Sequence, residues 1–131
     1  MPAPDTILAR KKVSALLDGA KMGRLSKMIL GLDGQISAAL SKKMIGGQWI
    51  SGTALIMPAG FEFQPSRLNQ PFFKNMDALR IHIPWPELIG VSKRFGVVAA
   101  IVDLETSADT LSVRCHGADD LIAKIKAARN A

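Results

Sequence analysis

The chain of 131 residues contains one cysteine, no tyrosine and only 5% aromatic residues. A lone cysteine, Cys115, cannot form a disulfide within the chain, so the sequence favours a reducing compartment. No stretch approaches the roughly 18 uninterrupted apolar residues that a membrane-spanning helix needs. The first twelve residues include Asp5 and the basic run Arg10 to Lys12, where a signal peptide would need an uninterrupted apolar core. We therefore expect one soluble, cytoplasmic domain that is large enough to enclose its own core.

Signatures of metal centres and enzymes are also missing. The sequence has two histidines, His82 and His116, and neither a C-x-x-C pair nor an H-E-x-x-H helix, so we expect no metal site. It has no G-x-S-x-G nucleophile motif. Gly46 and Gly47 precede an expected strand and not a helix, which argues against a glycine-rich phosphate loop. No pair of groups suited to acid–base or nucleophilic work emerges, and we expect a protein that is not an enzyme and uses no cofactor.

The positive charge is concentrated near the N-terminus. The formal net charge is +6, of which residues 1–43 carry +5 and residues 44–131 carry +1. Such a segment attracts anionic partners, for example a membrane surface or a nucleic acid. A solvated helix face that keeps the protein soluble is an equally good explanation.

Two helical segments frame the sequence. Residues 5–30 are expected to be helical, because Ala9, Val13 and Leu17 share a face at helical spacing, with a break near residues 19–23. Residues 118–129 form an amphipathic pattern with acidic residues at the start, basic residues at the end and an apolar stripe of Leu121, Ile122 and Ile125.

Between the helices, alternating apolar and polar residues predict a succession of strands. The clearest is GGQWISGTALIMPAGFEFQPSRLN, residues 46–69, which has the pattern of a hairpin turning at Pro58–Gly60. Trp49 lies within its first strand, where we expect it to be part of the core. The expected strands are residues 36–45, 48–57, 61–64, 79–83, 87–94, 97–104 and 110–115.

This hairpin, the later IHIPWPELIGVSKR, the strand VVAAIVDL and the closing helix together resemble GRAM domains, a branch of the pleckstrin-homology-like family. The resemblance covers about residues 35–128. It implies a mainly β fold, a seven-stranded antiparallel barrel capped by a C-terminal helix. The expected domains are therefore an N-terminal helical extension, residues 1–34, and a barrel with its helix, residues 35–131.

The resemblance also implies where a ligand would bind. In pleckstrin-homology domains two neighbouring loops hold acidic lipid headgroups, and the matching loops here carry Lys42 and Lys43, and Arg67 and Lys74. The loop from Glu105 to Asp109 is expected to oppose them with two acids. Phe72 and Phe73, in the irregular segment 65–78, are expected to contact a partner.

The expected function is a non-catalytic binding module that recognises either an anionic membrane surface or a protein partner. Peripheral association with the membrane would then accompany a cytoplasmic location. The alternative is a small basic nucleic-acid-binding protein, which only the sequence pI of about 9.8 supports. The sequence leaves the oligomeric state and the specific ligand open.

Overall fold

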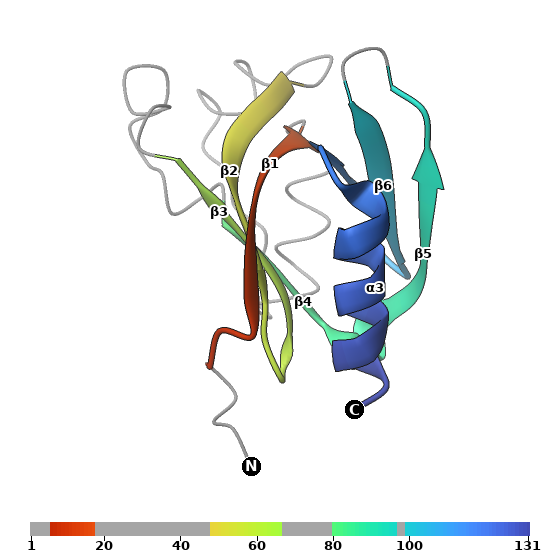
Figure 1. Cartoon of the computed structure of the whole chain (residues 1–131). Helices are drawn as coiled ribbons and strands as arrows, with labels where there is room; N and C mark the ends of the chain where they lie inside the picture. The colour runs from red at the N-terminus through yellow and green to blue at the C-terminus, as the bar shows by residue number, and fades with distance from the viewer. Residues whose placement is uncertain (1–5, 18–47, 67–79, 97–98) are drawn as a thin grey trace, which may run out of the picture.

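A computed structural model describes residues 6–17, 48–66, 80–96 and 99–131. In these ranges the protein is mostly β-structure, with seven antiparallel strands and one C-terminal α-helix (Figure 1). In chain order the elements are β1 (Ala9–Leu17), β2 (Gln48–Ile56), β3 (Gly60–Pro65), β4 (Ile81–Pro84), the short 3-10 helix η3 (Trp85–Glu87), β5 (Leu88–Arg94), β6 (Ala100–Thr106), β7 (Thr110–Cys115) and α3 (Ala118–Arg129).

The strands form one sheet in the order β4-β3-β2-β1-β7-β6-β5. The central strand β1 pairs with β2 from Ala9 opposite Ile56 to Leu17 opposite Gln48, and its end also pairs with β7. Among the described residues, no pairing joins β4 to β5 and closes the sheet into a complete barrel. In the same part of the chain, no helix is long and apolar enough to cross a membrane.

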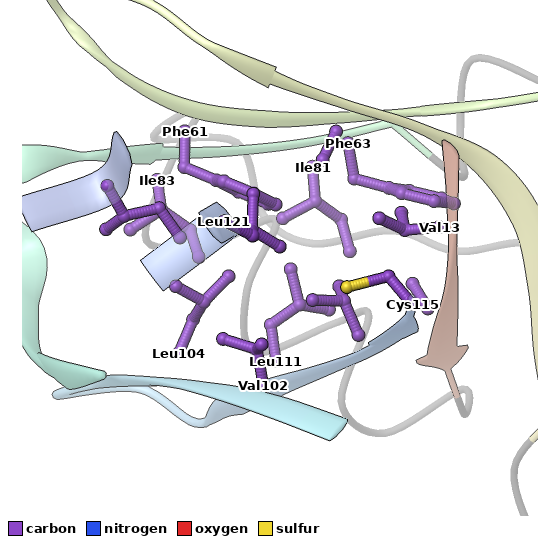
Figure 2. Close-up of a cluster of buried hydrophobic side chains, with 14 of the residues drawn as sticks. Val13, Phe61, Phe63, Ile81, Ile83, Val102, Leu104, Leu111, Cys115 and Leu121 are labelled. Carbon is purple, nitrogen blue, oxygen red and sulfur yellow. The ribbon is translucent and has the colours of Figure 1, made fainter. Parts of the chain in front are cut away.

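The core lies between the two halves of the sheet. Figure 2 shows Phe61, Phe63 and Ile83 from β3 and β4 opposite Leu104 from β6, with Leu121 of α3 between them. Both phenylalanines are fully buried, and burial of such a side chain contributes about 1.5–3 kcal/mol. Gly52 makes room for this packing, because a Cβ atom there would lie 2.7 Å from the Phe63 ring. The alternation along β2 and β3 thus directs one face of the hairpin into the core.

Gly117 is the N-cap residue of helix α3, and its φ of 70° is left-handed and favours glycine. Leu121 and Ile125 are buried, while Ile122 is half-buried against the same cluster. The Lys124 ammonium hydrogen-bonds the Asp120 carboxylate at 2.9 Å and lowers the pKa of that carboxyl. The predicted helix over residues 118–129 is therefore confirmed, together with its apolar stripe.

The helix expected over residues 5–30 is wrong for Ala9–Leu17, which form strand β1. Val13, Ala15 and Leu17 point into the core and belong to its main cluster. Pairing with β2 satisfies the backbone of this segment, whereas a helix would leave the edges of β2 and β7 open. Residues 18–47 lie outside the described residues, and with them the expected strand 36–45 and the boundary at residues 34 and 35.

The other strands lie close to their expected positions. Strands β2, β3, β5 and β7 match within two residues, whereas β6 begins at Ala100 and extends to Thr106. Trp49 is not in the core: it is half-buried, on the opposite face of β2 from the buried Ile50. Trp85 is the buried tryptophan, and its Nε1 donates to the Met57 carbonyl at 3.0 Å, which ties η3 to the β2–β3 turn.

Candidate functional site

A hollow of about 480 Å³ opens over the place where β1, β2 and β7 run side by side. Its polar lining comes from alternate residues along these strands. The residues that lie between them in sequence, Val13, Gly52 and Cys115, are buried. We call it the polar hollow and define it by six polar side chains: Lys12, Ser14, Ser51, Thr53, Arg114 and His116.

Strand pairing fixes the spacing of these side chains. Ser14 of β1 lies opposite Ser51 of β2 on one side and opposite Arg114 of β7 on the other. Lys12 lies opposite Thr53 in the next outward-facing pair. Residues directly opposite on neighbouring strands have Cβ atoms about 4.5–5.5 Å apart. Three strands therefore present a compact group of ammonium, guanidinium and hydroxyl groups.

The described residues that line the hollow carry positive charge without negative charge. None of the described residues that line it is aspartate or glutamate. Lys12 and Arg114 take part in no ion pair with any other described residue. Two cations without a local carboxylate attract an anion, and lysine, arginine and hydroxyl groups are all hydrogen-bond donors to phosphate-type oxygens.

An aromatic side chain supports the guanidinium group. The Arg114 guanidinium carbon lies 4.5 Å from the centre of the Trp49 ring, within the range of a cation–π interaction. Trp49 shares the outward face of β2 with Ser51. Stacking limits the conformations of the arginine side chain, so less freedom is lost when its N–H groups bind a ligand.

Asp103 of β6, whose pairing partner Ser112 is on β7, already has a cationic partner. Asp103 accepts from Arg94 Nε at 2.8 Å and from the Ser112 hydroxyl at 2.6 Å. Arg94 also contacts the Ser112 hydroxyl at 3.4 Å. This charge-assisted network holds β5, β6 and β7 together and leaves Asp103 with a cationic partner of its own.

The acids of the β6–β7 connection do not face the hollow. Thr106 and Asp109 close this turn through a hydrogen bond from the Thr106 hydroxyl to the Asp109 carbonyl at 2.6 Å. The turn joins one end of β6 to β7, whereas Arg114 and His116 lie at the other end of β7. Whether Glu105 and Asp109 oppose Lys42, Lys43, Arg67 and Lys74 stays a prediction, because these four residues lie outside the described chain.

A second hollow of about 430 Å³ lies over β2, β3 and the start of β4. Leu55 and Met57 form an apolar floor, and Glu62, Arg80 and His82 line its side. Its charges are matched, because Glu62 accepts from Arg80 at 3.4 Å and from Gln64 at 2.7 Å. This second hollow therefore lacks the unbalanced positive charge of the polar hollow.

All six side chains expected at the site, Lys42, Lys43, Arg67, Lys74, Phe72 and Phe73, lie outside the described residues. The residues of the polar hollow were not expected there. Lys12 falls in the segment that the sequence predicts as helical, and no sequence pattern links Lys12 to Arg114 or His116, because strand pairing alone brings them together. The alternating polar positions 10, 12 and 14 and 112, 114 and 116 were the available signal.

No triad of metal-ligating side chains occurs in the described part of the chain. Cys115 is buried beside the hollow, and burial raises the pKa of its thiol. The nearby Lys11 ammonium has a smaller effect that lowers the same pKa. At neutral pH the thiol therefore stays protonated, and it is a poor nucleophile.

Comparison with known proteins adds information on the fold alone. No protein-family model matches the sequence, and a search of curated proteins found no match. Among solved structures, the chain is similar to the crystal structure of the C-terminal domain of an unknown protein from Leishmania infantum. The TM-score is 0.58 at 14% sequence identity, over 96% of this chain and 85% of that one.

Proposed function

We propose that this protein is a non-catalytic binding module of the pleckstrin-homology-like type, and that the polar hollow holds a phosphate-type anionic group of its partner. The observation that carries the proposal is that Lys12 of β1 and Arg114 of β7 line the same hollow, with no carboxylate among the described lining residues. The strand order with its closing helix supports the family type.

The chemistry of the lining favours a phosphate-type group over a simple counter-ion. Arg114 offers a planar fork of donors, and Lys12 adds a compact point charge. Ser14 of β1 and Thr53 of β2 add hydroxyl groups to the same lining. Such a mixture satisfies several oxygens of one tetrahedral anion at once, which a lone surface lysine does not.

Titration with inorganic tripolyphosphate at low salt, followed by calorimetry and by amide chemical shifts, tests the site. Wild-type protein should bind, with the largest shift changes at residues 12–14, 51–53 and 114–116. The double variant Lys12→Gln/Arg114→Gln should bind about tenfold more weakly, because charge-assisted hydrogen bonds contribute about 1.5–3 kcal/mol each before solvent screening.

The matched control is Lys126→Gln/Arg129→Gln, which removes two positive charges from the exposed end of α3. It should bind tripolyphosphate like the wild type. An equal loss in both double variants would show that net charge alone attracts the anion and would refute the site. Thermal unfolding of each variant checks that the fold is retained.

A further inference from the structure

A large apolar side chain is exposed next to the polar hollow. Phe95, the first residue after β5, has 89% of its surface exposed, more than the other exposed large apolar residues of the described chain. The next residue, Gly96, approaches Ala99 so closely that a Cβ atom on Gly96 would lie 2.3 Å from the Ala99 carbonyl oxygen. Ala99 itself lines the hollow.

The strand topology places Phe95 at the same end of the sheet as the hollow. Arg94 of β5 and Arg114 of β7 both pair with Ile101 of β6, so the two arginines lie on either side of one residue. Phe95 follows directly after Arg94. The distance from the hollow to the phenyl ring is therefore set by two strand spacings and one residue, on the order of 10 Å.

The charges beside Phe95 already have partners. Lys93 pairs with Asp119 at 2.9 Å and lies 5.7 Å from the centre of the Phe95 ring, and Arg94 pairs with Asp103 at 2.8 Å. These contacts hold the end of β5 while the ring faces solvent. This end of β5 therefore presents the apolar surface of Phe95 to a partner. The attraction for anions comes from the polar hollow.

From this juxtaposition we propose that Phe95 inserts into an anionic lipid bilayer while the polar hollow binds a headgroup phosphate. The inference rests on the proposed function of the hollow and names the source of its phosphate. A bilayer presents phosphate groups in one plane with hydrocarbon beneath, which matches a basic hollow beside a protruding aromatic ring. A soluble phosphate compound would give the ring no apolar environment to enter.

The contributions of the hollow and of Phe95 differ in their dependence on salt. Attraction between the hollow and anionic lipid is screened as the salt concentration rises, whereas the transfer of a phenyl ring from water is not. Phe95→Ser should therefore weaken vesicle binding at low and at high salt by the same factor. Lys12→Gln/Arg114→Gln should weaken binding strongly at low salt and much less at high salt.

Sedimentation with phosphatidylcholine vesicles that contain one fifth phosphatidylserine makes this comparison. We expect Phe95→Ser to bind about tenfold more weakly, since partial burial of a phenyl ring is worth less than its full burial. The matched control is Ile89→Ser, which removes another exposed apolar side chain from the opposite end of β5. It should bind vesicles like the wild type.

Direct insertion has its own readout. In a Cys115→Ala background, Phe95→Cys labelled with an environment-sensitive fluorophore should show a blue shift with these vesicles and quenching by brominated lipid. The same label at Ile89→Cys should show neither. An unshifted label at position 95 overturns insertion, even where the vesicles bind.

The outcomes separate this inference from the proposed function. Phe95→Ser should still bind tripolyphosphate like the wild type. If wild-type protein binds tripolyphosphate but no vesicles, the membrane is not the partner and the anion site stands. If Phe95→Ser binds vesicles like the wild type, insertion of Phe95 is refuted and the anion site again stands. If the protein binds a single-stranded oligonucleotide more tightly than vesicles at the same salt concentration, the inference of a membrane partner is also overturned. If the wild-type protein does not bind tripolyphosphate, the proposal that the polar hollow binds an anion is refuted.

Discussion

Cys115 illustrates how burial controls a single side chain. Cys115 is 4% exposed at the end of β7, and desolvation raises the pKa of its thiol above that of a free cysteine, about 8.5. Lys11, whose Nζ would lie 3.0 Å from a Cβ atom on Gly117, only partly offsets this rise. The folded state therefore holds the proton more tightly than the unfolded chain does.

Stability should consequently depend on alkaline pH through this thiol. The favourable contribution is fully present below the pKa of the unfolded thiol and is lost as the pH rises through the higher pKa of the folded state. Because the chain lacks tyrosine, few other groups titrate below the lysines. Urea unfolding between neutral pH and pH about 10 should show a steeper loss for wild type than for Cys115→Ala. Equal slopes would contradict the assignment.

The properties of individual residues also explain why the sequence does not predict the polar hollow. Each of its side chains has an unremarkable sequence environment, and Lys12 in particular lies within a short basic run. Only the pairing of Ser14 with both Ser51 and Arg114 gathers them, and these partners are about 40 and 100 residues away. Phe95 was overlooked for the opposite reason: a single aromatic residue gives no periodic signal.

Among the elements, β1 is the one that sequence periodicity misassigned. Ala9, Val13 and Leu17 are four residues apart, and this spacing keeps residues on one face of a helix and also on one face of a strand. Local pattern therefore cannot decide between the two structures. The decision comes from β2 and β7, which leave a central position that only an extended segment can fill. By contrast, the sequences of β2, β3 and β7 alternate between core-facing and outward-facing residues over short runs, and this period of two does not match the period of a helix.

Strand β1 should accordingly be essential for folding. Deletion of residues 1–17 removes the middle of the sheet and exposes the edges of both β2 and β7. We expect no cooperative thermal transition for this truncation by circular dichroism. Deletion of residues 1–5, which precede the described chain, should retain the transition and serves as the control. Cooperative unfolding of the longer truncation near the wild-type temperature would show that β1 is dispensable.

For the whole molecule, α3 connects the two halves of the sheet, because it contacts β2 and β3 as well as β5 and β6. Leu121 lies at this junction and is 1% exposed, beside Phe61 and Ile83 on one side and Leu104 on the other (Figure 2). Replacement of a buried leucine by alanine leaves a cavity and costs about 2–5 kcal/mol. The same replacement on an exposed face of α3 should cost far less.

We therefore expect Leu121→Ala to lower the free energy of unfolding by about 2–5 kcal/mol, measured in urea, while Lys126→Ala changes it by less than about 0.5 kcal/mol. At a temperature where Leu121→Ala stays folded, its affinity for tripolyphosphate should equal that of the wild type, because the polar hollow is built on β1, β2 and β7. A loss of affinity without unfolding would mean that α3 also positions Arg114 or His116. A stability loss within error would show that α3 lies against the sheet without completing its core.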